Sequence, residues 1–378
     1  MLTKIILILN VFCFIFIIVF SGCDKNETVI GLQCNSLEEE IDSIAKQYVK
    51  VGAMIGVINR EQEKLVFSYG TKSFNDNDPP DANSVFEIGS ITKTFTTTLL
   101  ADMFLRGVFT DDTVNHHLPA DQVTIPSMNG IEITFGHLAT HTSGIPKAPH
   151  EDDSNFPLPP DFNYLSPYTC YTTEHIYDYL TNYCTLSFTP GTWWEYSNTG
   201  IGLLGHTLGL IDGTSYDSIL KRYLFDVLGM DNSSIYLTEQ QMNNLALSHN
   251  SNYEHGLYFY ANDIFQGAGS IKSSLNDMFK YLEAQLGLLE TRLRNAINLT
   301  HQSRMHQGSL GDQGLAWFIL ELDDGQVITY HGGDTYGYSA YIGFNKSAAT
   351  GVIILLNYCL NGTQLIMGQD ILKAINKY

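Results

Sequence analysis

The sequence predicts an α+β fold, in which an antiparallel β-sheet built from both ends of the chain is flanked by N- and C-terminal helices and joined to a mainly helical subdomain. Three observations lead to this prediction. Strand-like segments occur near both chain ends, at 53–59, 64–69, 327–330, 338–344 and 352–357. The middle of the chain, roughly 90–290, has a mostly helical pattern with long polar loops. Finally, 44% of the 378 residues are apolar, which is enough to fill a large core.

The folded part is expected to begin with a helix at residue 36. Ser36 and Glu39 form a capping-box pattern, and the apolar residues that follow share one helical face: Leu37, Ile41, Ile44, Ala45, Tyr48 and Val49. The polar turn 60–63 then joins the first two strands, and 363–378 is predicted to form the closing helix. We therefore expect one domain over residues 36–378, with a site in the cleft between the sheet and the helical part.

The first 22 residues are typical of a secretory signal. Lys4 precedes an apolar run over 5–20, and small residues follow it. The tetrad Phe20-Ser21-Gly22-Cys23 resembles a bacterial lipobox, although Phe stands in its first position instead of the usual Leu. The sequence therefore predicts an exported protein, periplasmic, attached to the cell envelope or secreted, with lipidated Cys23 as one possible membrane anchor. An uncleaved signal anchor is the alternative.

Charge and cysteine content exclude several kinds of protein. The formal net charge of -20 repels nucleic acid and anionic lipid surfaces. No CxxC pair supports a zinc ribbon or a redox centre. Cys170 and Cys184 are close enough in sequence to form a disulfide in an oxidising compartment, and buried unpaired thiols are the alternative.

A candidate nucleophile lies at the start of a predicted helix. Ser90 and Lys93 are three positions apart and share one helical face, so the amine of Lys93 can accept the proton of the Ser90 hydroxyl. The same spacing occurs twice more, at Ser43 with Lys46 and at Ser218 with Lys221, in stretches that we interpret as solvated helix faces.

Two further motifs complete a candidate catalytic set. In Tyr196-Ser197-Asn198 the phenol can transfer a proton to a leaving group, and the amide can bind a substrate carbonyl. In His331-Gly332-Gly333, at the end of a strand, Gly333 lets a substrate approach the backbone and His331 adds a polar or cationic group.

Taken in order, these three motifs resemble those of the serine β-lactamase and penicillin-binding-protein superfamily, in particular its class C β-lactamase and DD-peptidase branch. The linking segments at 133–144, 190–205, 228–230 and 267–270 are also similar to that family, so the resemblance covers the chain from about residue 36 onward. It implies that Ser90 is acylated, Lys93 is the base, Tyr196 is the proton shuttle, and Asn198, His331 and Gly333 contact the substrate. It also implies an oxyanion hole made by the backbone N–H groups of Ser90 and Asp334. The motif departs from class C β-lactamases at His331, where those enzymes usually carry Lys.

Other patterns are interpreted as structural. His137 and His141 have zinc-ligand spacing, but Leu138 replaces the Glu of HExxH, and the GxGxxG run at 200–205 lacks a βαβ context. Most of the aromatic residues near the second motif are expected in the core, with one or two facing the cleft: Tyr164, Tyr168, Tyr171, Phe188, Trp193 and Trp194.

The sequence thus predicts an exported serine hydrolase that uses no metal or organic cofactor and acts on a peptide or other small acyl substrate. Peptidoglycan-type D-Ala peptides are the expected substrates. β-Lactams, esters, or a weakly hydrolytic sensor that binds penicillin or muropeptides are the alternatives.

Overall fold

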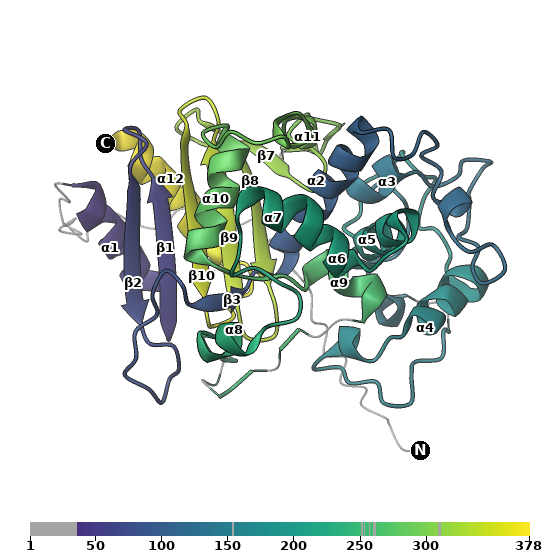
Figure 1. Cartoon of the computed structure of the whole chain (residues 1–378), viewed down its shortest axis with the longest axis horizontal. Helices are drawn as coiled ribbons and strands as arrows, with labels where there is room; N and C mark the ends of the chain where they lie inside the picture. Colours follow the sequence, from purple (N-terminus) through teal and green to yellow (C-terminus); the bar gives the residue numbers. More distant parts are fainter. Residues whose placement is uncertain are drawn as a thin grey trace, which may run out of the picture.

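A computed structural model describes residues 36–378 except 153–154, 251, 253, 257, 260–261 and 309–310. The predicted signal segment and Cys23 lie outside the described residues. Within these residues the chain forms one large antiparallel sheet of eight strands in the order β2-β1-β10-β9-β8-β7-β6-β5. Helices cover both faces, and a mainly helical region lies beside the sheet (Figure 1). The predicted α+β architecture is confirmed.

Both chain ends contribute to the sheet. The strands are β1 (Gly52–Ile58), β2 (Lys64–Gly70), β5 (Met305–His306), β6 (Asp312–Gln313), β7 (Phe318–Glu321), β8 (Val327–Asp334), β9 (Ser339–Asn345) and β10 (Thr350–Leu356). β1 pairs with β10 so that Ile55 lies opposite Ile354. A short second sheet joins β3 (Val85–Glu87) to β4 (Lys272–Ser274).

Alternating side chains place β1 between two cores. Ala53, Ile55 and Val57 pack with α1 (Leu37–Tyr48) and α12 (Gln364–Lys377), whereas Met54 and Ile58 belong to the core on the opposite face. All seven residues of β1 are buried, as expected for a central strand covered on both sides. Ser36 caps α1 by accepting a hydrogen bond from the backbone N–H of Glu39.

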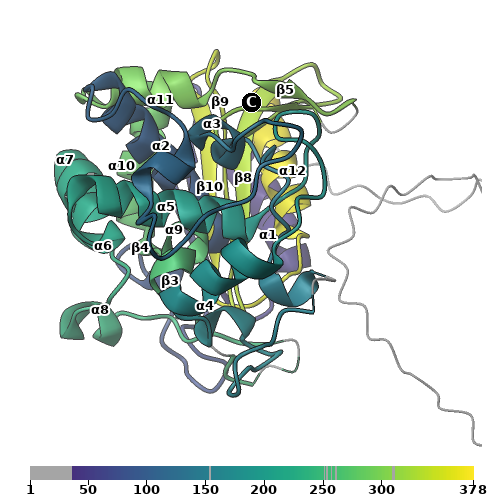
Figure 2. The same ribbon diagram turned by 90° about the vertical axis from the view of Figure 1, so that its right-hand side faces the viewer.

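The opposite face is covered by α10 (Leu275–Leu286) and by the helical region (Figure 2). Between β3 and β5 the remaining helices are α2 (Thr92–Leu105), α3 (Phe135–Ala139), α4 (Thr173–Asp178), α5 (Asn198–Asp212), α6 (Tyr216–Leu220), α7 (Asp226–Leu228), α8 (Glu239–Asn243), α9 (Gln266–Gly269) and α11 (Arg294–Thr300). Short 3₁₀ or π segments are η1 (Gly89–Ile91), η2 (Val114–His117), η3 (Pro149–Glu151), η4 (Pro167–Thr169), η5 (Tyr179–Tyr183), η6 (Lys221–Phe225) and η7 (Asp263–Phe265).

Close packing of α5 against its neighbours explains the glycines of the GxGxxG run. A Cβ atom on Gly202 would lie 2.4 Å from the carbonyl oxygen of Ile264, and one on Gly205 would lie 3.0 Å from the Cα atom of Gly267. These glycines therefore let α5 pack closely against η7 and α9. Helix α9 in turn contacts α2, so that Ala268 lies beside α2.

The two cysteines considered for a disulfide are free thiols in the structure. Cys170 donates a hydrogen bond to the backbone carbonyl of Asp161, and burial raises the pKa of Cys184 to about 12. The structure therefore favours the alternative of unpaired thiols. Among the described helices, none is long and apolar enough to cross a membrane.

Candidate active site

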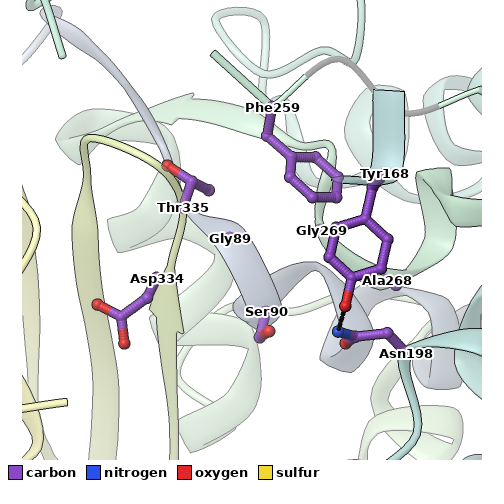
Figure 3. Close-up of a pocket in the computed structure, with 9 residues that line it drawn as sticks. All are labelled: Gly89, Ser90, Tyr168, Asn198, Phe259, Ala268, Gly269, Asp334 and Thr335. Atoms are coloured by element: carbon purple, nitrogen blue, oxygen red, sulfur yellow. Dashed lines mark hydrogen bonds between the residues drawn. The ribbon is translucent and has the colours of Figure 1, made fainter. Parts of the chain in front are cut away.

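Ser90 lies in η1, directly after β3 and directly before α2. Its side chain is half-buried and faces a small pocket of about 60 Å³ (Figure 3). The pocket is lined by Gly89, Ser90, Tyr168, Asn198, Phe259, Ala268, Gly269, Asp334 and Thr335. Three of the predicted site residues, Ser90, Asn198 and Asp334, thus line one pocket.

Lys93 lies in the first turn of α2 and is fully buried. Its Nζ atom is 2.9 Å from Oγ of Ser90 and also donates to the backbone carbonyl of Ala268. Burial, together with the positive charge of Lys147, holds the pKa of Lys93 well below its usual range. A neutral amine at hydrogen-bond distance from the Ser90 hydroxyl can accept its proton.

Tyr196 lies in the loop immediately before α5 and is half-buried. The Nζ atom of Lys93 is 5.0 Å from the centroid of its ring. The second motif therefore lies next to the first. This is the arrangement that a proton transfer shared by Lys93 and Tyr196 requires.

Asn198 is the first residue of α5, and its side-chain amide donates to the hydroxyl of Tyr168 at 2.6 Å (Figure 3). Tyr168 lies in η4 and is one of the aromatic residues that the sequence indicated as possible cleft residues. Phe259 and Thr335 also line the pocket, and no motif or spacing in the sequence pointed to them.

The third motif brings β8 against the backbone of η1. A Cβ atom on Gly333 would lie 2.0 Å from the carbonyl oxygen of Ile88 and 3.1 Å from the backbone nitrogen of Ser90, so only glycine fits there. A Cβ atom on Gly89 would likewise lie 2.9 Å from the backbone nitrogen of Asp334. The two glycines therefore bring the backbone nitrogens of Ser90 and Asp334 near one another.

The carboxylate of Asp334 points away from Ser90 (Figure 3). It accepts hydrogen bonds from Oγ of Ser339 and, at 2.9 Å, from Nε2 of Gln364. Only the backbone of Asp334 is thus available to an oxyanion beside Ser90.

His331 lies deeper than the sequence suggested. Its side chain is only 2% exposed and is absent from the lining of the pocket. Its Nδ1 atom is 2.6 Å from the carbonyl oxygen of Gly332, so this nitrogen carries the proton. Burial, reinforced by the nearby charge of Lys93, lowers the pKa of His331 to about 3. The structure therefore favours a neutral His331 over a cation that binds a carboxylate.

This geometry predicts the pH profile. Because the pKa of His331 lies near 3, its charge does not change between pH 5 and 9, and kcat/KM should follow the same pH profile for a carboxylate-bearing peptide and for a neutral ester. His331→Gln should retain activity, since it keeps a neutral polar side chain. A selective loss of activity on the carboxylate-bearing peptide as the pH rises through 6.5 would contradict the neutral assignment.

The two other Ser and Lys pairs with the same spacing lie outside the pocket, and their lysines have other partners. Lys46 pairs with Asp42, and Lys221 pairs with Asp226 at 2.6 Å. His137 and His141 are not joined in a metal site: Nδ1 of His137 accepts from the backbone N–H of Thr134, and Nδ1 of His141 accepts from that of Ser197.

Comparison with known proteins decides the family. A family model described as Beta-lactamase matches residues 37–362. The chain belongs to the beta-lactamase family. As a member of this family it is a serine hydrolase.

Individual relatives of this beta-lactamase-family chain are distant. It is 24% identical over 356 residues to a beta-lactamase of Pseudomonas fluorescens, which covers 85% of the chain and 92% of the relative. It is 27% identical to the D-alanyl-D-alanine-carboxypeptidase/endopeptidase AmpH of Escherichia coli, over 62% of the chain and 57% of the relative. The crystal structure of a beta-lactamase/D-alanine carboxypeptidase from Pseudomonas syringae superposes with a TM-score of 0.74 at 21% identity, covering 89% of this chain and 98% of the other.

Proposed function

We propose that the protein hydrolyses acyl substrates through a covalent ester on Ser90. The observation that carries the proposal is the 2.9 Å contact between Oγ of Ser90 and the buried amine of Lys93, whose pKa is held low. In the first step Oγ bonds to the substrate carbonyl carbon, and its proton passes to Nζ of Lys93. The backbone N–H groups of Ser90 and Asp334 stabilise the resulting oxyanion.

The bond to the leaving group then breaks. Tyr196 transfers a proton to that group, and the proton taken up by Lys93 replaces the one that Tyr196 gives away. Water next attacks the carbonyl carbon of the acyl-enzyme, and its proton passes to the Lys93 and Tyr196 pair. The bond between Oγ and the acyl group then breaks, the pair returns that proton to Oγ of Ser90, and the carboxylic acid leaves. Asn198 binds the substrate amide or carbonyl from the side of Tyr168.

D-Ala-terminated peptides are the first substrate class in this proposal. The names of two relatives support it, one being a D-alanyl-D-alanine-carboxypeptidase/endopeptidase and the other a beta-lactamase/D-alanine carboxypeptidase. The signal-like sequence before residue 23 supports a further part of the proposal, namely that the enzyme acts outside the cytoplasm.

Neutral acyl esters are the second candidate, and His331 is the observation that favours them. A buried, neutral His331 offers no positive charge to a substrate carboxylate. Among the residues that line the described pocket, the only charged side chain is Asp334, and it points away.

A paired substrate screen tests the proposal. Turnover is measured on a D-Ala-D-Ala peptide, on the same peptide with its C-terminal carboxylate amidated, on nitrocefin and on short p-nitrophenyl esters. Faster hydrolysis of the free peptide supports the D-Ala assignment, whereas equal or faster hydrolysis of the amidated peptide and the esters supports the second candidate. Labelling of Ser90 without turnover of any of them would indicate a sensor and contradict the proposed hydrolytic function.

Tyr196→Phe tests the proton shuttle. The variant retains the ring but loses the hydroxyl, and we expect kcat to fall roughly 10²- to 10⁴-fold, the usual contribution of general acid–base catalysis. Stopped-flow acylation and steady-state kinetics measure the effect, and circular dichroism checks the fold. Near-normal turnover would mean that another group carries the proton.

A further inference from the structure

The loop that carries Tyr196 is held by one residue outside the three motifs. Tyr196 precedes α5 and lies outside any regular helix or strand, so the position of its hydroxyl depends on how the neighbouring peptide groups are fixed. The backbone N–H of Glu195 donates to the carbonyl oxygen of His141 at 2.9 Å. The backbone N–H of Ser197 donates to Nδ1 of the same histidine at 3.1 Å. His141 thus accepts hydrogen bonds from the backbone N–H groups of the two residues that flank Tyr196.

The ring of His141 also packs on the ring of Tyr196. The two ring centroids are 4.4 Å apart with an interplanar angle of 31°, and Trp194 approaches His141 edge-on at 6.1 Å. Only 1% of His141 is exposed. The backbone and the side chain of one residue therefore restrict Tyr196 through three contacts to it and to its neighbours.

The backbone of His141 is itself in an unusual conformation that presents the ring to this loop. Its φ angle is +58°, in the left-handed region that a histidine rarely adopts. The turn that follows α3 holds it there, because the N–H of His141 donates to the carbonyl of Leu138 and the N–H of Thr142 donates to that of His137.

His141 keeps its acceptor nitrogen across the working pH range. Since Nδ1 accepts the Ser197 N–H, the neutral ring carries its proton on Nε2. Burial holds the pKa of His141 well below its usual range. A protonated ring would lose the bond to Ser197, so neutrality preserves the support of Tyr196.

We propose that His141 is a positioning residue that fixes Tyr196 beside Lys93, an inference that rests on the shuttle role proposed for Tyr196. His141 contacts the catalytic loop through its backbone carbonyl, its Nδ1 atom and its ring face, and it acts on the reaction through Tyr196. Its loss should therefore lower kcat more than it changes KM.

Two substitutions at His141 form a matched pair. Glycine and asparagine both tolerate a positive φ angle, but only asparagine has a side-chain acceptor that can replace Nδ1. We expect kcat to fall roughly 10- to 100-fold in His141→Gly, as misplaced catalytic groups typically cause, and His141→Asn to recover most of that loss with KM little changed. If His141→Gly does not fold by circular dichroism, His141→Ala, which lacks an acceptor and adds the smallest side chain to the left-handed conformation, replaces it in the comparison.

A double-mutant cycle with Tyr196→Phe separates positioning from general structural damage. If His141 acts through the Tyr196 hydroxyl, then adding His141→Gly to Tyr196→Phe should cost less than about 3-fold in kcat. Equal kcat losses in the Gly and Asn variants, or multiplication of the two losses in the double variant, would overturn the inference while leaving the proposed function intact. Full activity of Tyr196→Phe would instead overturn the proposed shuttle role together with this inference.

Discussion

Ser90→Ala should reduce the hydrolysis of every accepted substrate by roughly 10⁴- to 10⁶-fold, because loss of a nucleophile removes the acyl-enzyme route as a whole. The substitution deletes a single oxygen atom, and the remaining pocket lining is unchanged. Steady-state kinetics with a chromogenic ester measures the loss, and the binding of an unreactive substrate analogue checks that the pocket is intact.

Ser43→Ala and Ser218→Ala are the controls for this result. Both residues are followed by Lys at the same spacing, but their lysines pair with Asp42 and Asp226. Both controls should keep full activity. Retained turnover in Ser90→Ala, or its loss in either control, would contradict the assignment of Ser90 as the nucleophile.

Lys93→Met should lower the rate of acylation by roughly 10²- to 10⁴-fold while leaving the fold intact, since methionine fills the buried space of the lysine side chain without a basic nitrogen. The wild-type rate should rise with pH as Lys93 loses its proton and then level off. Because burial lowers the pKa of Lys93, this rise should lie well below the pH at which an exposed lysine titrates.

In Lys93→Met the acylation rate should not show this rise with pH. Stopped-flow measurement of acylation from pH 5 to 9 tests this. Lys221→Met is the matched control, because Lys221 is solvent-exposed and pairs only with Asp226 among the described ion pairs. An unchanged pH profile in Lys93→Met would mean that a different group is the base.

Local sequence patterns were sufficient to predict the central part of the fold. The strands 53–59, 64–69, 338–344 and 352–357 differ from β1, β2, β9 and β10 by at most two residues at either end, because each combines apolar side chains with clear polar boundaries. The closing helix, expected over 363–378, was also close to the observed α12.

The strands between β8 and the β5 edge of the sheet were not predictable in the same way. β5 and β6 have two residues each, so they contain too little sequence to show any alternation. β8 extends four residues beyond the predicted 327–330 because it includes the His331-Gly332-Gly333 motif, where glycines weaken the strand pattern but pairing with β9 stabilises it.

The candidate site was predictable where chemistry depends on short spacing and unpredictable where it depends on tertiary contacts. Ser90 and Lys93 meet because they lie on one helix turn. Phe259 reaches the same pocket from a distant loop, and His141 was interpreted as structural because its role depends on the backbone of Glu195 and Ser197. The burial of His331 likewise depends on tertiary packing that no motif encodes, including the ring of Phe318 in β7, whose centroid is 5.4 Å from that of His331.

Identification of the residue that carries the acyl group is the most direct test of the account. The purified protein is treated with a fluorophosphonate probe, digested and analysed by peptide mass spectrometry, with Ser90→Ala treated in parallel. We predict one modified site, Ser90, and no label on the variant. Label on Ser43 or Ser218, or labelling that persists in Ser90→Ala, would contradict the central claim that Ser90 is the nucleophile of this enzyme.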